Sequence, residues 1–418
     1  MNQNISPVSC DFDPLSISAE AAMEKILKTV RPLQVVETVA IREALGRVLA
    51  ADLVSAVKVP NHTNSAMDGY ALKGDDLPEG ESKPFDIIGV AFAGKPFLDK
   101  VETGQCVRIM TGAVMPEGTD SVVVQERVDK DDQRIVVHAG ERKGDNVRYA
   151  GEDLGIGEVA IPAGVRLGAS HLGLAASLGF AELRVVRRPR VAFFSNGDEL
   201  KPIGTPLKVG ELYDSNRYTL HAMLTDLGVE LIDLGVVADD AEAIAQTFTT
   251  AAASADMVIT SAGASVGDAD YVKQTLDSLG KVNFWKVAIK PGRPLSFGQL
   301  GDSLFFGLPG NPVSVMVTFA LFVKPAVKQL AGEKYAVPLK MKVKTLSRLK
   351  KRPGRTEYQR GILSLDENGN TVVRSTGEQG SGILSSMSLA NCYIILPTDS
   401  AGVEEGDSVE VQPFDHVC

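Results

Sequence analysis

Cysteine and histidine are scarce in this chain of 418 residues, which has four cysteines and five histidines. The cysteines Cys10, Cys106, Cys392 and Cys418 lie far apart, without a CxxC pair or a histidine at matching spacing. This spacing argues against a structural zinc site and against a disulfide framework. The motifs HExxH, GxxxxGK[ST] and GxGxxG after a first strand are also absent, which disfavours histidine-based metal catalysis and the common nucleotide loops.

Positive charge and long apolar runs are lacking as well. The formal net charge is −10 at pH 7, whereas nucleic-acid binding needs a basic face that neutralises phosphates. We find no uninterrupted apolar run long enough to span a bilayer, and residues 1–13 have no basic and apolar leader. We therefore expect a cytoplasmic protein with no nucleic-acid partner and no membrane partner. The basic clusters at 184–190 and 342–355 are interpreted as solvated edges.

The pattern of apolar residues, glycine and proline changes along the chain, which predicts a multidomain α/β protein. Residues 188–335 alternate strands and helices, which is typical of a doubly wound, mostly parallel sheet. Residues 56–145 carry short apolar runs separated by glycine and proline, which predicts an inserted small β domain. The pattern of residues 336–418 predicts a small C-terminal β barrel or sandwich, of which we favour the barrel. The remaining segments, 14–55 and 146–187, are expected to form a helical linker domain that also serves dimerisation.

The N-terminal segment carries two predicted helices. One begins after Ser18, and the other covers Thr38–Leu49, whose apolar residues recur at helical spacing. A further helix is expected after His171. These helices need partners against which to bury their apolar faces.

The most informative stretch is 256–270, which predicts a buried strand, a loop of glycine and serine, and then a helix. Glycines let the backbone approach a ligand closely, and the start of a helix offers unpaired N–H groups, so this arrangement is typical of an anion cradle. Two carboxylates, Asp268 and Asp270, crowd the same place. A divalent cation would reconcile them with a bound anion.

Four other segments are expected at the carboxyl ends of strands, where ligands bind in open α/β sheets. Each has a plain structural interpretation: Asp239 or Asp240 as a helix cap, Asn311 and Pro312 as a helix start, and Lys290 as part of a turn. Five such loops at one sheet edge are hard to explain as separate accidents. The four segments are 195–200, 238–240, 285–294 and 307–314.

A second candidate lies outside that sheet. Asp68 precedes Gly69 in the segment 64–71, where the plain interpretation is an Asp-Gly turn. Thr111-Gly-Ala and Gly151-Glu-Asp153 are similar elements. Without further information the turn interpretation is favoured for all three.

Eight motifs are spread along the chain. They are Asn64-Ser-Ala-Met-Asp-Gly-Tyr-Ala, Arg108-Ile-Met-Thr-Gly-Ala, Gly151-Glu-Asp, Gly197-Asp-Glu-Leu, Tyr213-Asp-Ser-Asn, Ser265-Val-Gly-Asp-Ala-Asp-Tyr, Lys290-Pro-Gly and Gly307-Leu-Pro-Gly-Asn-Pro-Val-Ser. Taken together, these motifs resemble the family of molybdopterin molybdenumtransferases, which includes the C-terminal part of the scaffold protein gephyrin. The resemblance runs nearly end to end. It implies an elongated homodimer that inserts molybdate into adenylylated molybdopterin with Mg²⁺ and releases AMP, each site being completed by the β domain of the partner subunit.

The resemblance also implies roles for single residues. The catalytic set is Asp68, Glu199, Asp239, Asp270, Lys286 and Lys290, in which Glu199, Asp239 and Asp270 bind Mg²⁺ and the two lysines neutralise oxyanion charge. The set that contacts the substrate is Ser261, Gly263, Ser265, Gly267, Arg293, Pro309, Pro312, Thr111, Asp153, Arg360 and Ser381. Molybdopterin adenylyltransferase and acceptor molybdoenzymes are the implied partners.

Three positions depart from the family pattern. Ala262 stands in a Ser-Gly-Gly motif, where backbone closeness or a positive φ is wanted. Asn196 replaces a Thr or Ser, and Arg293 stands where Lys is frequent, which turns a point charge into a fork that can hold phosphate bidentately. A gephyrin-type scaffold and another phosphoanhydride-cleaving enzyme stay open as alternatives, and the residues do not separate molybdate from tungstate.

Overall fold

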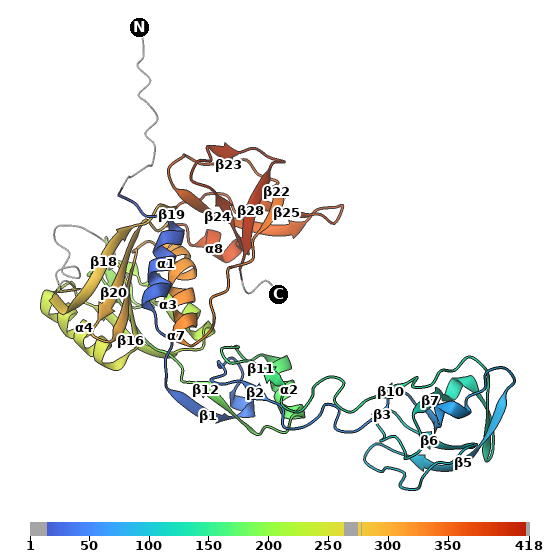
Figure 1. Cartoon of the computed structure of the whole chain (residues 1–418). Coiled ribbons are helices and arrows are strands. Elements are labelled where there is room, and N and C mark those ends of the chain that lie inside the picture. Colours follow the sequence, from blue (N-terminus) through green and yellow to red (C-terminus); the bar gives the residue numbers. More distant parts are fainter. Residues whose placement is uncertain (1–14, 263–274, 277, 415–418) are drawn as a thin grey trace. The chain divides into compact units, whose positions relative to one another are not determined.

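The computed structural model describes residues 15–262, 275–276 and 278–414 (Figure 1). The chain divides into two compact units. The first comprises Met1–Glu37, Gly46–Val48 and Val186–Cys418, and the second comprises Thr38–Leu45 and Leu49–Val185.

A six-stranded sheet in the order β16-β13-β17-β21-β20-β18 forms the centre of the first unit. The four strands from β16 to β21 pair in parallel, and the remaining two pairings are antiparallel. This confirms the predicted mostly parallel sheet. The strands are β13 (Arg190–Asn196), β16 (Glu230–Val237), β17 (Met257–Ser261), β18 (Gly280–Lys286), β20 (Pro294–Leu300) and β21 (Ser303–Leu308).

Apolar side chains cover both faces of this sheet, because alternate residues of a strand point to opposite sides. Val191 and Phe193 pack into one core, and Ala192 and Phe194 pack into the other. The helix α4 (Ala241–Ser254) covers the second core. The first core is covered by α1 (Ala19–Thr29), α3 (Ser215–Asp226), α6 (Pro312–Thr318), the π-helical turn η4 (Phe319–Val323) and α7 (Lys324–Leu330).

The helical run Pro312–Leu330 bears on the expectation that no apolar run is long enough to span a bilayer. Among the described residues it is the one helix long and apolar enough to cross a membrane, and 61% of its apolar window is buried inside the protein. It packs against the central sheet, as the core helix of a globular domain does.

The second sheet of the first unit contains the predicted C-terminal barrel. The strands follow the order β19-β24-β25-β22-β28-β26, and an additional pairing of β24 with β26 closes five of them into a ring. The sixth, β19 (Ile289–Lys290), joins β24 from outside. The barrel strands are β22 (Met341–Thr345), β24 (Thr356–Leu365), β25 (Thr371–Ser375), β26 (Cys392–Leu396) and β28 (Ser408–Pro413). Shorter elements nearby are β23 (Leu349–Lys350), β27 (Gly402–Val403) and α8 (Ser385–Leu389).

The second unit contains the predicted inserted β domain, a sheet in the order β7-β4-β6-β5-β9-β8. Its strands are β4 (Gly69–Leu72), β5 (Lys83–Ala91), β6 (Gln105–Ile109), β7 (Ser121–Val124), β8 (Val128–Asp131) and β9 (Arg134–Val137). A smaller part carries α2 (Ala169–Ser177), β2 (Leu53–Val54) and β11 (Val159–Ile161). Two-residue strands β3 (Asn64–Ser65) and β10 (Val147–Arg148) pair with each other.

The prediction of a helix at Thr38–Leu49 is wrong. The structure has a strand there, β1 (Val36–Ala40), which pairs with β12 (Glu182–Val186), followed by one short turn η1 (Ile41–Glu43). Val36, Thr38 and Val39 are β-branched and favour a strand, and Gly46 has φ 72°, which no helix continues through. The helix after Ser18 is confirmed, with the Ser18 hydroxyl accepting the N–H of Ala21 at 3.1 Å.

Candidate functional site

A cavity of about 1060 Å³ opens between the loops at the carboxyl ends of the central strands and the C-terminal barrel. One wall comes from residues 290–294 and 309–314, and the other from residues 347–359 and 375–381. The predicted residues Lys290, Arg293, Pro309 and Ser381 all line it. The structure therefore brings together one part of the site inferred from the sequence.

The end of β17 is held tightly before the chain enters the predicted cradle. Ser261 is 2% exposed, and its hydroxyl donates to the hydroxyl of Ser195 on the neighbouring strand at 3.0 Å. Its side chain thus ties two strand ends together. The cradle residues Gly263, Ser265, Gly267 and Asp270 lie outside the described residues.

Ala262 has φ 74°, in the left-handed region that glycine prefers. This confirms the expectation that a positive φ is wanted at the position where the family pattern has glycine. Ala262 lines the cavity, and a Cβ built on Gly310 would lie 3.7 Å from the Ala262 Cβ. The Gly310 carbonyl is held by the Asn216 side chain, which donates to it at 2.7 Å.

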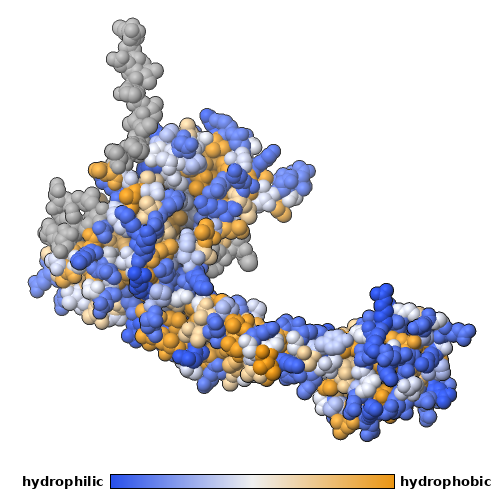
Figure 2. All heavy atoms as spheres, in the orientation of Figure 1, coloured by the Kyte–Doolittle hydropathy of each residue, from blue (hydrophilic) through white to orange (hydrophobic). Residues whose placement is uncertain are grey.

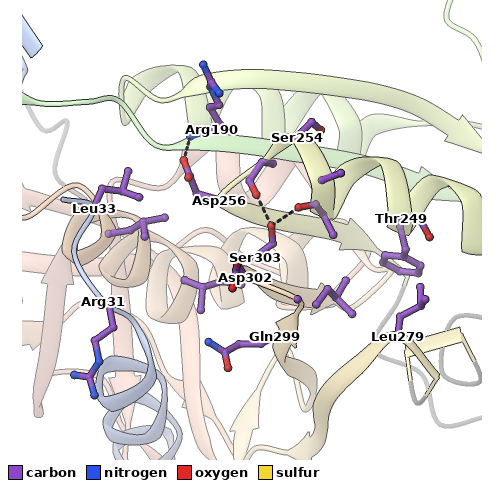
Figure 3. A pocket seen from close by; sticks show the side chains of 18 of the residues that line it. Arg31, Leu33, Arg190, Thr249, Ser254, Asp256, Leu279, Gln299, Asp302 and Ser303 are labelled. Carbon is purple, nitrogen blue, oxygen red and sulfur yellow. Dashed lines mark hydrogen bonds between the residues drawn. The ribbon is translucent and has the colours of Figure 1, made fainter. Parts of the chain in front are cut away.

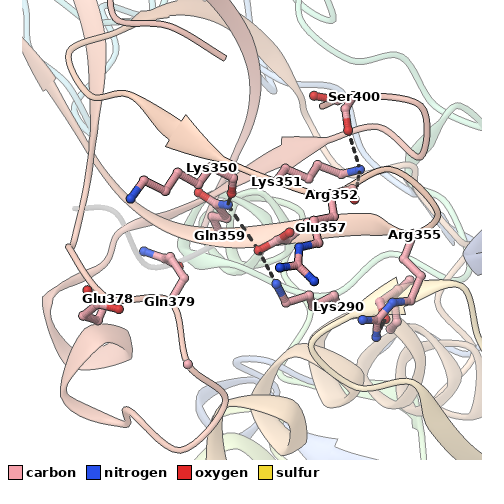
Figure 4. Close-up of polar contacts among 12 residues, drawn as sticks. Lys290, Lys350, Lys351, Arg352, Arg355, Glu357, Gln359, Glu378, Gln379 and Ser400 are labelled. Carbon is pink, nitrogen blue, oxygen red and sulfur yellow. Dashed lines mark hydrogen bonds and ion pairs between the residues drawn. The ribbon is translucent and has the colours of Figure 1, made fainter. Parts of the chain in front are cut away.

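Basic side chains from the barrel complete the cationic lining. Arg348, Lys350 and Arg355 line the cavity with Lys290 and Arg293. Figure 4 shows Lys290, Lys350 and Arg355 among them. Arg348 and Lys350 are exposed, as the interpretation of the basic cluster at 342–355 as a solvated edge predicts, although the place of these three residues at the cavity was not expected. Sequence periodicity does not reveal them, because their closeness to Lys290 depends on how the barrel docks against the central sheet.

A buried glutamate lies among these cations. Glu357 is 4% exposed, and its Oε1 lies 3.2 Å from the Lys290 Nζ. Gln359, also buried, donates to the same Oε1 at 3.2 Å and to the Lys350 carbonyl at 2.9 Å. Neither Glu357 nor Gln359 was singled out from the sequence.

Arg360 lies behind the cavity wall. It is 1% exposed and donates to the Ser386 hydroxyl at 2.9 Å and to the Gly380 carbonyl at 3.0 Å. Burial lowers the pKa of its guanidinium. Successive strand residues point to opposite faces, so Arg360 faces away from the cavity that Glu357 and Gln359 line. Its hydrogen bonds shape the loop that carries Ser381.

The predicted residues Glu199 and Asp239 follow two neighbouring strands and do not line the cavity. The Asn196 amide donates to the Asp239 carboxylate at 3.3 Å, and the Asp239 N–H donates to the Asp198 carboxylate at 3.3 Å. The carboxylate of Glu199 lies against Gly197, where an added Cβ would come within 2.6 Å of Oε2. These contacts connect the ends of β13 and β16.

The choice between Asp239 and Asp240 as a helix cap is settled. Asp240 caps α4, since its carboxylate accepts the N–H groups of Glu242 at 3.1 Å and Ala243 at 2.9 Å. Asp239 is exposed and is left for another role. Pro312 begins α6, as its plain interpretation predicted.

Lys286 lies at the end of β18, far from Asp239. The two residues follow opposite edge strands of the sheet, with four strands between them. At about 4.8 Å per strand the separation is roughly 24 Å. Only a long ligand could contact both.

Oxygen donors suited to Mg²⁺ are present, although not as a complete set. Among the described residues no three His, Cys, Asp or Glu side chains gather as a metal site. Glu199 and Asp239 match Mg²⁺ in chemistry, because carboxylate oxygens are its preferred protein ligands. The third predicted ligand, Asp270, lies outside the described residues.

In the second unit Asp68 and Thr111 meet. The Asp68 Oδ1 accepts the backbone N–H and the hydroxyl of Thr111, both at 2.8 Å, and these bonds hold the pKa of Asp68 below its usual range. Arg108 lies 5.1 Å from the centroid of the Tyr70 ring and donates to the Gly69 carbonyl at 3.1 Å. The predicted residue Asp153 is exposed, in a separate turn.

A second hollow, of about 740 Å³, lies where β13, β17 and β21 begin, at the opposite end of the central sheet (Figure 3). Its polar groups serve the fold. Asp256 accepts the N–H of Arg190 at 2.7 Å and the guanidinium of Arg187 at 2.8 Å, and the Ser303 hydroxyl donates to two backbone carbonyls. None of the predicted site residues lines it.

Three family models match consecutive parts of the chain. The MoeA N-terminal region (domain I and II) matches residues 17–179. A probable molybdopterin binding domain matches residues 192–329, and the MoeA C-terminal region (domain IV) matches residues 342–414.

Similar proteins cover nearly the whole chain. The molybdopterin molybdenumtransferase of Haemophilus influenzae is 41% identical over 403 residues, which is 96% of this chain and 99% of that protein. The one from Nostoc is 36% identical and covers 90% of this chain and 88% of its own. The crystal structure of a molybdopterin biosynthesis moeA protein from Pyrococcus horikoshii has a TM-score of 0.83 at 29% identity, covering 96% of this chain and all of that one.

Proposed function

The chain belongs to the family of molybdopterin molybdenumtransferases, and we propose that it inserts molybdate into adenylylated molybdopterin in a Mg²⁺-dependent reaction that releases AMP. The protein is a transferase of molybdenum cofactor biosynthesis. The substrate form, the metal requirement and the assembly are the parts that we propose.

The cationic cavity is the observation that carries the proposal. Lys290, Arg293, Arg348, Lys350 and Arg355 converge on a volume at the upper end of the usual range for ligand sites. A pyrophosphate and a tetrahedral oxyanion repel each other unless cations lie between and around them. The cavity supplies those cations from two walls.

We propose that Glu199 and Asp239, with Asp270, hold the Mg²⁺ at the other side of the sheet edge. When bound, the cation would neutralise part of the charge of the pyrophosphate. The chain's own residues then have separate tasks: the lysines and arginines of the cavity orient the anionic groups, and the loop around Ala262 and Gly310 lets the substrate approach the backbone. The dithiolene sulfurs come from the substrate, which fits the scarcity of cysteine.

The width of the site supports an extended substrate. Lys286 and Asp239 lie roughly 24 Å apart by strand count. A molecule that joins a pterin to a nucleotide through a pyrophosphate is long enough to contact residues over much of that span. A small mononucleotide would contact one part only.

We also propose a cytoplasmic homodimer with shared sites, in which Asp68 and Thr111 act on the partner's substrate. Exposed apolar side chains support a contact surface: Val54 and Val159 are cross-strand neighbours, 43% and 48% exposed, and Ile156 is 65% exposed. Figure 2 shows hydrophobic colour over this part of the chain. Molybdopterin adenylyltransferase would supply the substrate, and acceptor molybdoenzymes would take the product.

The test supplies the purified protein with adenylylated molybdopterin, molybdate and Mg²⁺. AMP is measured by chromatography, and active cofactor by reconstitution of a molybdenum-free acceptor enzyme. We expect both products, and neither without the protein. If neither forms, the proposed reaction is wrong. Turnover of ATP with free molybdopterin would instead favour an adenylyltransferase, and normal cofactor synthesis by a pocket-dead variant would favour a scaffold.

A further inference from the structure

Glu357 is a buried carboxylate in the wall of a cavity whose charged lining residues are mainly cations. The other carboxylate of the described lining, Glu378, is exposed, whereas Glu357 is 4% exposed. An ionised carboxylate is costly to bury unless it is paired, and here it also repels any anion in the cavity. Its position therefore requires an explanation that binding of an anion alone does not give.

The backbone brings Glu357 beside Lys290. The strand β19 pairs in parallel with β24, with Lys290 opposite Glu357 and Ile289 opposite Thr356, and the Thr356 N–H donates to the Ala288 carbonyl at 2.9 Å. Side chains of directly opposed residues lie on the same face of a sheet. The 3.2 Å ion pair between Lys290 and Glu357 follows from this register.

A third side chain fixes the carboxylate. Gln359 is two residues further along β24, so it lies on the same face as Glu357. It is 3% exposed, donates to the Glu357 Oε1, and donates to the Lys350 carbonyl as well (Figure 4). A buried donor with two partners leaves the carboxylate little freedom to turn.

The neighbouring Lys351 uses its ammonium to bind backbone carbonyls of the barrel. Lys351 is buried, and its ammonium donates to the carbonyls of Arg352, Thr398 and Ser400 at 3.2, 3.2 and 3.0 Å. An ammonium has three N–H donors, so these carbonyls satisfy all of them. Lys290, which is 45% exposed at its side chain, is the cation whose position Glu357 can set.

We propose that Glu357 is a positioning residue that holds the Lys290 ammonium at the face of the cavity, where it meets the oxyanion in the reaction. The inference rests on the proposed function, since Lys290 is assigned to the oxyanion there. Glu357 itself contributes repulsion and not affinity. Its effect should therefore fall on the rate of the bound complex rather than on the strength of anion binding.

The first test is Glu357→Gln, which keeps the shape and removes the charge. We expect kcat for AMP release to fall about tenfold or more, as for other groups that orient a reacting residue. KM for molybdate should change by less than about threefold. Calorimetric binding of tungstate, measured without adenylylated molybdopterin so that no insertion can follow, should be no weaker than in the unaltered protein. An unchanged kcat, or a loss of tungstate binding with kcat intact, overturns the inference.

A double-variant cycle separates positioning from structure. If Glu357 acts through Lys290, Glu357→Gln should cause no further loss in a Lys290→Ala protein. A further loss of similar size in that background would show an independent role. Glu357→Asp should recover part of kcat, and thermal unfolding of each variant identifies any that fail to fold, in which case the Asp variant carries the comparison.

The control is Glu410→Gln, which removes another barrel carboxylate paired with a lysine, at 3.1 Å from Lys340. It should leave kcat and KM unchanged. Failure of the proposed function has a different signature: the unaltered protein then releases no AMP. An active protein whose Lys290→Ala variant is fully active would remove Lys290, and with it the role of Glu357, while leaving the reaction in place.

Discussion

Thr111 donates two hydrogen bonds to one oxygen of Asp68, from its backbone N–H and from its hydroxyl, each 2.8 Å long. The residues are 43 positions apart in the chain, and each belongs to a turn that could be dismissed alone. The contact fixes the Asp68 carboxylate on the surface of the β domain. It also favours the ionised form, which is the form that could act on a cation or a proton.

We predict that Thr111→Val raises the pKa of Asp68 but leaves it below the ordinary value. The backbone N–H is the largest cause of the lowered pKa and survives the substitution, whereas the hydroxyl bond is lost. Because the folded pKa is lowered, the related stabilisation is present above the ordinary aspartate pKa of about 3.9 and is lost as the pH falls through the folded value. Carboxyl NMR titration measures the shift. A pKa equal in both proteins contradicts this account.

We predict that subunits carrying Asp68→Ala and subunits carrying Asp239→Ala complement each other. Each homodimer should be nearly inactive, since Asp68 is proposed to act across the interface. After random mixing, half of the dimers are heterodimers with one intact site, so about a quarter of the original activity should return. AMP release of the mixture measures this. If the mixture stays as inactive as its parts, the sites are not shared.

We predict that Gly197→Ala weakens the response to Mg²⁺. Gly197 has φ 145°, and a Cβ there would come within 2.6 Å of the Glu199 carboxylate, which must then move. The Mg²⁺ concentration for half-maximal AMP release should rise several-fold, while KM for molybdate should change little. Gly204→Ala, at another positive-φ glycine with open space around it, is the matched control. An equal Mg²⁺ response in both variants would count against Glu199 as a ligand.

The central sheet could be predicted because its strands carry their own signal. Val191–Phe194 and Met257–Ile259 are short, fully buried apolar runs, so their type follows from the local pattern. The prediction of a helix at Thr38–Leu49 failed because its apolar residues have helical spacing but several of them are β-branched. There the pairing with β12 and the strand preference of those residues decide the structure.

The candidate site was predicted where single loops carry it and missed where two domains meet. Lys290 lies just beyond the end of β18 and could be found from its position, and Ala262 was found as a departure from the family motif. Glu357 and Arg355 could not, because their place in the cavity depends on the pairing of β19 with β24. The orientation of Arg360 follows from the alternation of side chains along a strand. Glu357 and Gln359 share one face of β24, so Arg360 lies on the other.

Ala262 gives the last prediction, because it is a non-glycine residue at φ 74° in the cavity wall. An alanine in this region costs about 1–2 kcal/mol relative to ordinary backbone, whereas glycine accepts it but loses more entropy on folding, by about 0.5–1 kcal/mol. Ala262→Gly should therefore raise the thermal unfolding midpoint slightly or leave it unchanged. Ala262→Val should lower it clearly, because a β-branched residue fits this region worst.

The same pair of variants tests the link between this strain and the substrate. Removing the Ala262 Cβ opens the space beside Gly310, so we expect Ala262→Gly to bind adenylylated molybdopterin at least as tightly, and Ala262→Val more weakly. Equilibrium binding and thermal unfolding are measured on the same preparations. A Val variant as stable as the unaltered protein would mean that the backbone at this position does not keep its positive φ, and the strain argument would then be wrong.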